Sequence, residues 1–408
     1  MAKIDQPLLS SLRRTSPSSK TLFITLSSIT LLLLLALLSH HVNTENQHQV
    51  CKHAFDPSSC QAIISKHSPA GIFRRTDADL LQILIQKSMF NIDDIAIKAA
   101  GLYKQSNESN QRAGLENCIE MMDLSHGRLH DCASAINSIR IQSTTPVAED
   151  VYAWLAGVVT NHVTCLDGLN GVAKSTLVVQ LNTLIGLAMT SLAVFSSISP
   201  SSLAQVRPQR AGDFPSWLRA EDYMVVRGLH GKIKADVVVA KDGSGNYMTI
   251  QEAVAMAPEN GEARYVIYVK KGRYEEKVVM GRKKKNVVIV GDGMDSTIVT
   301  GSLNVADGST LFDSATFVAL GDGFMAQDIW FQNVAESKKG QAVALLVAAD
   351  RSVINRCRID GYHNALWAHS LRHLYRDCTI SGAINFMFGD AISVLQDCKF
   401  IRQKAMCN

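Results

Sequence analysis

Two hydrophobic periods divide this chain. Between residues 51 and 200, apolar residues recur three and four positions apart, as in the segments 80–85, 151–159 and 181–187. This period predicts amphipathic helices. Helices of this kind, joined by short polar connections, predict an all-α, four-helix up-and-down bundle over residues 51–200.

From residue 235 the pattern changes to short β-branched segments separated by Gly, Asp and Asn, which predicts strands. The later part is a quasi-repeat in which Cys357, Cys378 and Cys398 recur about twenty residues apart, with a looser copy starting at Phe324. This period predicts a solenoid whose coils bury their apolar faces on one another. Because the leucine-and-asparagine pattern of leucine-rich repeats is absent, we favour an all-β, right-handed parallel β-helix over residues 235–408.

The repeat also suggests where its cysteines lie and how the solenoid ends. The three cysteines would stack in the interior, either as small apolar filler or as disulfides. No capping helix or polar final unit precedes Asn408. Because solenoids need terminal caps, we expect an incomplete, truncated β-helix.

The N-terminus predicts export. Residues 21–39 contain no charged side chain and are long enough to cross a bilayer core as a helix. Basic residues before them place residues 1–20 in the cytoplasm. We interpret residues 21–39 as a signal anchor, with a cleaved signal peptide as the alternative. Farther along, residues 201–234 have the composition of a linker.

The nine cysteines agree with an oxidising compartment. Cys51 and Cys60 lie close together at the start of the helical region, and Cys118 and Cys165 are the other natural candidates for disulfides there. The odd total leaves at least one thiol unpaired within the chain. The sequence leaves the pairing of the others open: Cys132, Cys357, Cys378, Cys398 and Cys407. Given export, Asn107 is a candidate glycosylation acceptor.

Charge and spacing exclude several classes of function. The net charge of +4 is too weak to argue for nucleic acid but suits contact with an acidic polymer. The basic run 282–285 is expected to be a solvated turn. Two histidine pairs have helical spacing, but neither has a third ligand, so we expect no metal. The pairs are His126 with His130 and His369 with His373.

Ordered sequence blocks carry the most specific signal. In the helical half the block is Ala-Trp-Leu-Ala-Gly-Val-Val-Thr-Asn-His-Val-Thr-Cys-Leu-Asp-Gly, over residues 153–168. In the second half the blocks are residues 238–247, 249–253, 272–276, 341–345 and 375–378. With these blocks in order, the chain resembles the plant pectin methylesterases, or pectinesterases, that carry an N-terminal pectinesterase-inhibitor domain. The resemblance implies a β-helix that removes methyl groups from homogalacturonan without metal or cofactor.

The resemblance also implies a set of site residues. In the family one aspartate attacks the ester, a second exchanges protons, and glutamines stabilise the oxyanion. Here the block Gly-Tyr-His-Asn-Ala-Leu-Trp puts Asn364 at the acid/base position and His363 at a glutamine position. The block Gly-Ala-Ile-Asn-Phe-Met-Phe-Gly puts Asn385 at the nucleophile position. Only Gln341 retains the family's residue.

These departures predict a family member whose esterase domain is inactive, because an amide neither cycles a proton nor attacks an ester as a carboxylate does. An active pectinesterase is the alternative, for instance with His363 as a base oriented by Asp360 or Asp390. A second alternative is an inhibitor that binds an active pectinesterase through its helical domain. A third is the product of a truncated gene, since the family's Leu-Gly-Arg-Pro-Trp block does not occur before Asn408.

We therefore expect a protein of the secretory pathway that reaches the cell wall or apoplast, anchored to the membrane or secreted. Its expected partners are homogalacturonan, an active pectinesterase through the helical domain, and a membrane through residues 21–39. Nucleic acid is not among them. Tyr274 and Glu276 are expected to be packing and turn residues of the β-helix.

Overall fold

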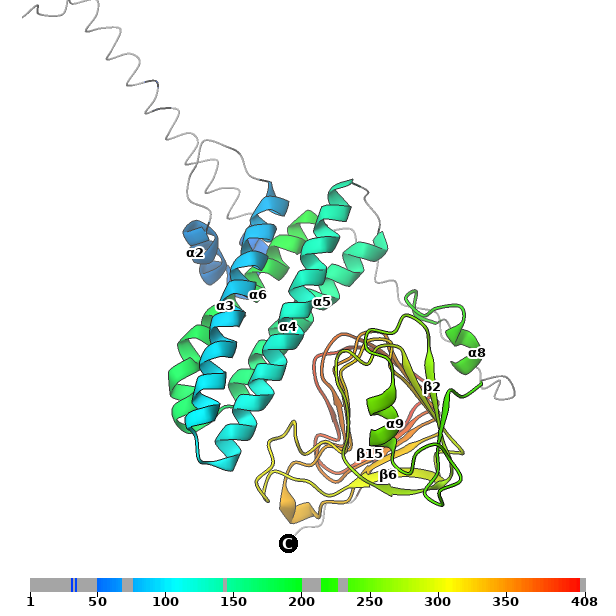
Figure 1. Ribbon diagram of the computed structural model, residues 1–408. Helices are drawn as coiled ribbons and strands as arrows, with labels where there is room; N and C mark the ends of the chain where they lie inside the picture. The colour runs from blue at the N-terminus through cyan, green and yellow to red at the C-terminus, as the bar shows by residue number, and fades with distance from the viewer. Residues whose placement is uncertain are drawn as a thin grey trace, which may run out of the picture.

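A computed structural model describes residues 31, 34, 50–67, 76–141, 145–199, 214–226 and 234–403. Apart from two positions, the predicted signal anchor lies outside the described residues. Most of the predicted linker and Cys407 also lie outside them. The described chain forms a helical bundle that lies beside a β-helix (Figure 1).

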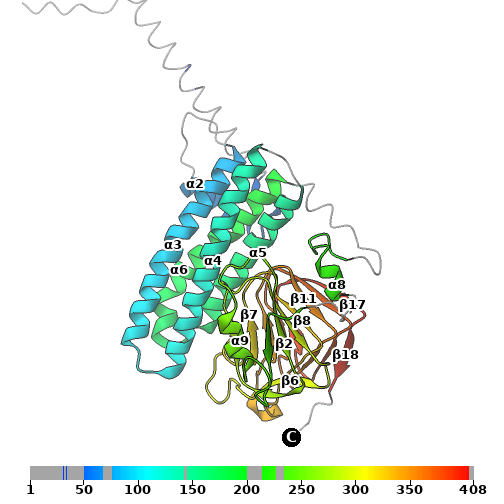
Figure 2. The ribbon, with the colours of Figure 1, turned by 45° about the vertical axis from the view of Figure 1, so that its right-hand side comes forward.

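Four long helices form the bundle. They are α3 (Asp77–Gln105), α4 (Ser109–Ile141), α5 (Thr145–Gly168) and α6 (Gly171–Ile198). Figure 2 shows the four helices lying side by side, and each of them packs mainly against two of the others, so the predicted four-helix up-and-down bundle is confirmed. A capping box begins α3: the Asp79 N–H donates to the Thr76 hydroxyl, and the Asp79 carboxylate accepts from the Thr76 N–H.

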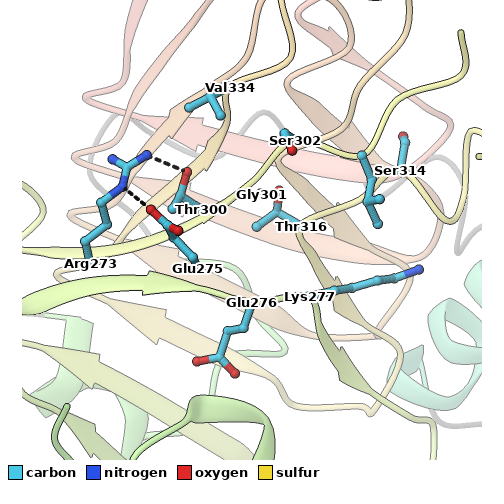
Figure 3. A pocket seen from close by; sticks show the side chains of 11 residues that line it. Arg273, Glu275, Glu276, Lys277, Thr300, Gly301, Ser302, Ser314, Thr316 and Val334 are labelled. Carbon is cyan, nitrogen blue, oxygen red and sulfur yellow. Dashed lines mark hydrogen bonds and ion pairs between the residues drawn. The ribbon is translucent and has the colours of Figure 1, made fainter. Parts of the chain in front are cut away.

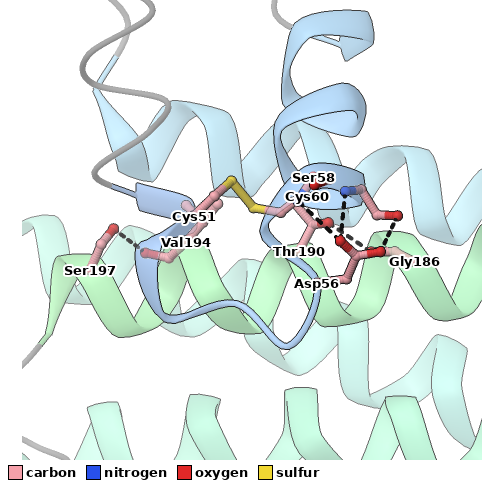
Figure 4. Close-up of a disulfide and its surroundings, with 9 residues drawn as sticks. Cys51, Asp56, Ser58, Cys60, Gly186, Thr190, Val194 and Ser197 are labelled. Atoms are coloured by element: carbon pink, nitrogen blue, oxygen red, sulfur yellow. Dashed lines mark hydrogen bonds between the residues drawn. A yellow bond between two sulfur atoms is a disulfide. The ribbon is translucent and has the colours of Figure 1, made fainter.

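Two disulfides fasten the bundle. A short segment with the 3₁₀ turn η1 (Cys51–His53) and α2 (Pro57–His67) lies across α6 and is closed by the Cys51–Cys60 bond (Figure 4). The second bond joins Cys118 of α4 to Cys165 of α5. Both bonds cross-link elements that also share the hydrophobic core.

Helix α6 is strongly apolar along most of its length. Among the described residues it is the one helix long and apolar enough to cross a membrane by length and composition. Half of its most apolar window is buried, and Leu177, Leu181 and Leu184 are fully buried in the bundle. Its apolarity is therefore that of a core helix.

The second region is a parallel β-helix with three sheets, in which every strand pair is parallel, and this confirms the predicted fold. The seven-stranded sheet holds β1 (Val237–Val239), β2 (Tyr265–Val269), β5 (Val287–Gly291), β8 (Met325–Gln327), β11 (Ser352–Asn355), β14 (Arg372–Arg376) and β17 (Ile392–Gln396). The six-stranded sheet holds β3 (Gly272–Glu275), β6 (Thr297–Gly301), β9 (Trp330–Asn333), β12 (Arg358–Asp360), β15 (Thr379–Gly382) and β18 (Lys399–Arg402). The five-stranded sheet holds β4 (Val278–Met280), β7 (Phe317–Ala319), β10 (Leu345–Val347), β13 (Leu366–Ala368) and β16 (Met387–Phe388).

Short helices accompany the β-helix. They are α8 (Asp222–Val226), α9 (Ile250–Met256) and the 3₁₀ turn η3 (Ser337–Lys339). Figure 1 shows α9 across one end of the coils. The Glu276 carboxylate accepts from the backbone N–H groups of Ile250 and Gln251 at 2.9 Å each, where it satisfies the start of this helix. Tyr274 is buried and its hydroxyl donates to the Lys270 carbonyl. Both residues are structural, as predicted.

The sequence repeat coincides with the coil register. Ser352 pairs with His373, which in turn pairs with Ser393. Before each repeated cysteine stands a residue with positive φ: Arg356 at 47°, Asp377 at 51° and Asp397 at 52°. This left-handed residue turns the chain from one sheet into the next, so each period of the sequence is one turn of the solenoid.

Candidate functional site

The candidate site lies at the corner between the six-stranded and five-stranded sheets. Gln341 precedes β10, His363 and Asn364 lie between β12 and β13, and Asn385 lies between β15 and β16. The Ala342 N–H donates to the His363 carbonyl at 3.0 Å. The Asn364 N–H donates to the Ile384 carbonyl at 3.1 Å. The structure therefore brings these four positions together on three successive coils.

Both asparagines occupy left-handed backbone. Asn364 has φ 69° and Asn385 has φ 41°. Asn and Asp are the residues other than Gly that adopt this conformation most readily, because their short polar side chains bond locally. An aspartate at either position therefore fits the same backbone.

The two asparagines differ in environment. Asn364 is 2% exposed, and its Oδ1 has no hydrogen-bond partner among the residues that the structure describes. Asn385 is exposed, while Gln341 and His363 are half-buried. Burial lowers the pKa of His363, which favours its neutral imidazole. None of the four side chains carries a negative charge.

Neither neighbouring carboxylate completes a histidine relay. Asp360 accepts from Arg358 at 2.7 Å and from the Ser381 hydroxyl at 2.6 Å. Asp390 accepts from the Thr160 hydroxyl at 3.2 Å. Within the described residues no hydrogen bond or ion pair joins either aspartate to His363. The geometry thus gives the alternative of an oriented His363 base no support.

An aromatic pair beside the site was not singled out from the sequence as functional. Trp367 pairs in register with Phe388 on the next coil, and their ring centroids are 5.2 Å apart. Trp367 is only 8% exposed, and both residues belong to the hydrophobic cluster of the helical bundle. Their 21-residue separation follows the repeat, which was the signal that could have revealed them.

A pocket of about 350 Å³ lies at the same corner on earlier coils (Figure 3). Its lining includes Arg273 and Glu275 of β3 and Thr300 at the end of β6. Arg273 donates to both of these side chains. Lys277, which also lines the pocket, pairs with Asp313 at 3.0 Å. The cations of the pocket are therefore already paired with carboxylates of the chain.

The helical bundle docks on the β-helix through α4 and α5. Its core continues into outward-facing residues of the five-stranded sheet and the turns around it, among them Val318, Leu346 and Trp367. On α4, Arg128 donates to Asp322 at 2.7 Å. The bundle therefore covers the sheet that adjoins the candidate site.

Helix α5 presents one face to the β-helix. Asp150, Trp154, Gly157, Thr160 and Thr164 recur at three- or four-residue spacing, and each contacts a residue of the β-helix. Most of them lie in the block at residues 153–168 quoted above. This sequence block is thus an interface between the two domains of the same chain.

A buried ion cluster occupies the centre of this interface. Arg372 donates to Asp350 at 2.6 and 3.0 Å and to Asp150 at 2.6 Å. The Trp154 indole N–H donates to Asp350 at 3.1 Å. Burial alone would raise the pKa of Asp350, but hydrogen bonds from Arg372 and nearby arginine charges bring it to about 2. The aspartate is therefore ionised at neutral pH and joins both domains.

A glycine makes the close approach of α5 possible. A Cβ at Gly157 would lie 2.8 Å from Cδ2 of the buried Leu371, whereas one at Gly101 of α3 meets nothing within 4 Å. We expect Gly157→Leu to destabilise the full chain by about 1–3 kcal/mol through overpacking. The matched Gly101→Leu change should stabilise it by about 0.5–1 kcal/mol, because leucine favours a helix more than glycine does. Urea unfolding measures both, and equal effects at the two glycines would contradict the docking.

Three fully buried histidines predict a pH dependence of stability. Burial lowers the pKa of His162 and His369 from 6.5 to about 3, and that of His373 from 6.5 to about 4. His369 lies in the interface, with its Nε2 2.9 Å from the Thr164 hydroxyl. In the unfolded chain these three histidines bind protons below pH 6.5. In the folded chain they bind protons only near pH 3 to 4. Their contribution is therefore complete above 6.5 and is lost as the pH falls from 6.5 towards 3.

We expect the free energy of unfolding to fall by up to about 1.4 kcal/mol per pH unit for each histidine in this window. His369→Asn should remove about a third of the decline, because one of three such groups is lost. His130→Asn, at an exposed position of α4, is the matched control and should leave the decline intact. Urea unfolding at pH 7 and pH 5 measures the decline in the free energy of unfolding for each protein. A decline that His369→Asn leaves unchanged would show that another group is responsible.

Comparison with known protein families gives two matches in order. Residues 46–199 match the model of the plant invertase/pectin methylesterase inhibitor family. Residues 236–408 match the pectinesterase model. The two matches correspond to the bundle and the β-helix.

Individual relatives cover nearly all of the chain. Pectinesterase/pectinesterase inhibitor 18 from Arabidopsis thaliana is 42% identical over 98% of this chain and 74% of its own length. A pectinesterase/pectinesterase inhibitor from Ficus pumila var. awkeotsang is 42% identical over 99% of this chain and 74% of its own. Among solved structures, the pectin methylesterase from carrot is 51% identical with a TM-score of 0.42. The match covers 42% of this chain and 54% of the carrot chain.

Proposed function

The chain belongs to the pectinesterase/pectinesterase-inhibitor family of cell-wall pectin modification, and from this premise we propose that its esterase domain does not turn over methyl-esterified homogalacturonan. One observation carries the proposal. The two positions to which the resemblance assigns the family's aspartates hold Asn364 and Asn385, on adjacent coils of the same corner.

The chemistry explains the expected loss. Ester hydrolysis through an acyl intermediate needs a nucleophile at position 385 and a group at position 364 that gives and takes a proton. The carboxamide nitrogen is not a useful nucleophile, and the amide does not exchange a proton near neutral pH. Among the described residues no carboxylate orients the His363 imidazole, since Asp360 and Asp390 bond to other groups, so we assign it neither function.

The test is methanol release from methyl-esterified homogalacturonan by the purified full chain. We expect a rate on the order of 10⁴-fold or more below that of an active family member, since the loss of one member of such a catalytic unit already has an effect of this size. A rate within tenfold of an active plant pectinesterase would refute the proposal. Retention on immobilised homogalacturonan, measured in parallel, reports whether the corner still binds the polymer.

A second function is supported by the docking of the bundle. The faces of α4 and α5 bind a pectinesterase-type β-helix, namely that of the same chain, so the helical domain has the surface of an inhibitor. Because this surface is occupied, the intact chain should not slow an active pectinesterase added to it. A change on the β-helix side of the interface, Asp350→Asn, leaves α4 and α5 unaltered, so the chain that carries it should slow the added enzyme. Equal effects of the two chains would speak against the inhibitor function.

Localisation remains part of the proposal. We propose that the chain reaches the cell wall through the secretory pathway, with residues 21–39 as the signal anchor and Asn107 glycosylated. Asn107 is exposed between α3 and α4, where an oligosaccharide has room. Carbonate extraction of membranes distinguishes an anchored from a secreted chain. A mobility shift on glycosidase treatment that Asn107→Gln abolishes tests the modification.

A further inference from the structure

Three thiols stack on successive coils of the β-helix. The residues that follow them pair in register, Arg358 with Thr379 and Thr379 with Lys399. Cys357, Cys378 and Cys398 therefore stand opposite one another. Neighbouring strands lie about 4.8 Å apart, which falls within the Cα–Cα range of about 4.4–6.8 Å for disulfides. Either adjacent pair could thus be bridged with little movement of the backbone.

The sulfur atoms lean towards the preceding coil. Sγ of Cys378 lies 3.3 Å from the Ile354 carbonyl, and Sγ of Cys398 lies 3.5 Å from the Tyr375 carbonyl. Cys398 therefore points towards the coil that holds Cys378. A hydrogen bond between these two thiols lowers the pKa of Cys398, while burial raises the pKa of Cys378 well above its ordinary range.

Accessibility separates the two possible pairs. Cys357 and Cys378 are buried, and Cys398 is half-buried. Thiol–disulfide exchange begins with a thiolate that an outside disulfide can reach, so Cys398 is the group that reacts first. Its neighbour across the ladder is Cys378, whereas Cys357 lies one coil farther away.

We propose that Cys378 and Cys398 form a site of disulfide modification that clamps two adjacent coils of the β-helix. The oxidant is a small disulfide of the secretory pathway, of the glutathione type. The Cys398 thiolate attacks one sulfur of this disulfide, forms a mixed disulfide and releases one thiolate. The Cys378 thiol then loses its proton to that thiolate and attacks the Cys398 sulfur, which breaks the mixed disulfide and releases the second small thiolate, and this takes up the proton that Cys398 gave to the solvent. One disulfide has been reduced to two thiols, and two protein thiols have been oxidised.

The bridge encloses the turn that holds Asn385. The chain between the two cysteines contains the whole of β15, β16 and β17 and the exposed end of the candidate site. Closing this loop restricts the alternatives open to the unfolded chain, so the last described coils should open less often. The proposal is independent of whether the site hydrolyses esters.

Peptide mapping of the full chain tests the proposal. The purified protein is equilibrated with oxidised glutathione, alkylated under denaturing conditions and digested with trypsin. Both cysteines fall in the tryptic peptide 377–399, since Arg376 precedes it and Lys399 ends it. We expect this peptide to carry no alkyl group and to be lighter than the reduced, unalkylated peptide by the mass of two hydrogen atoms. Recovery with both thiols alkylated, or with Cys398 linked to Cys407 or to another chain, would overturn the proposal.

Two variants complete the experiment. Cys398→Ser should leave Cys378 alkylatable after denaturation, whereas the matched Cys357→Ser change should keep the light peptide. Oxidation should slow proteolysis within residues 382–402 at least about tenfold in the native chain and in Cys357→Ser, but not in Cys398→Ser. Equal rates of proteolysis for the oxidised and the reduced native chain would show that the disulfide does not stabilise these coils, and this would refute the proposal. Because the mapping uses the unaltered protein, its result does not depend on whether a variant folds.

Discussion

Replacing Asn364 and Asn385 together by aspartate should raise methanol release from methyl-esterified homogalacturonan at least about 100-fold above that of the unaltered chain, the lower range for acid–base catalysis. Both positions have left-handed backbone that accepts aspartate as readily as asparagine. The expected gain therefore comes from charge and proton transfer, without a change of fold.

The two environments suit two different roles. A carboxyl at position 364 would be buried, and burial raises the pKa of a carboxyl group, as a proton donor requires. A carboxyl at position 385 would be exposed and ionised, as a nucleophile requires. The same backbone corner thus separates acid from nucleophile through solvent exposure alone.

The single variants are the internal controls. Because nucleophile and proton donor act as a unit, Asn364→Asp and Asn385→Asp alone should each stay close to the rate of the unaltered chain. Urea unfolding should show Asn385→Asp as stable as the unaltered chain, whereas Asn364→Asp and the double variant should be folded but less stable at pH 7, because a buried carboxyl with a raised pKa lowers stability there. If the double variant folds normally and still releases no methanol, the site lacks more than its two carboxylates. If a single variant matches the double, the assignment of roles is wrong.

Access to the site adds a second factor. Trp367 and Phe388 lie beside the asparagines, and the bundle packs against them. A polymer entering this corner would meet the bundle, so adding Gly157→Leu to the double variant should raise the rate further. The same addition to the unaltered chain should produce no methanol.

The sequence predicted the local parts of this arrangement well. The twenty-residue period reported the coil register, since Ser352, His373 and Ser393 pair as the repeat aligns them. The helical period over residues 80–85 reported buried positions such as Leu81 and Leu84. These patterns are readable because each residue's environment is fixed by its neighbours in the same element or coil.

The docking of the two domains could not be read in this way. Arg372 and Asp150 are 222 residues apart, and Thr164 and His369 are 205 apart. No period links such pairs, and a single arginine or threonine on a helix gives no sign of the surface that it contacts. The block at residues 153–168 indicated the family, but its one-sided contact with the β-helix became visible only in the structure.

Asp350→Asn should give the largest loss of stability, about 3–5 kcal/mol in the free energy of unfolding, because it removes one charge from a buried ion cluster. Asp350 is 3% exposed and accepts two hydrogen bonds from the Arg372 guanidinium. It also accepts the Trp154 indole N–H from the other domain. An asparagine keeps one acceptor oxygen but has no charge, so among the described residues the buried guanidinium retains Asp150 as its carboxylate partner, and a donor that faced the second oxygen of Asp350 meets an amide NH₂ instead.

The control is an aspartate in an exposed ion pair. Asp94 accepts from Lys98 at 2.7 Å on the surface of α3, where the two side chains are 49% and 40% exposed. Asp94→Asn should change stability by less than about 0.5 kcal/mol, as exposed pairs do. Urea unfolding of the full chain at pH 7 compares the two variants. An Asp350→Asn loss as small as that of Asp94→Asn would mean that the cluster is not closed to water.

Acid unfolding separates the ion cluster from the buried histidines. The pKa of Asp350 is lowered from 3.8 to about 2, so its stabilising effect is complete above 3.8 and is lost as the pH falls through 2. The histidines act in a higher window, from 6.5 down to about 3. Asp350→Asn should therefore lower stability almost uniformly between pH 7 and pH 5 without changing the slope. His369→Asn should change the slope there, so the two halves of the same interface can be measured independently.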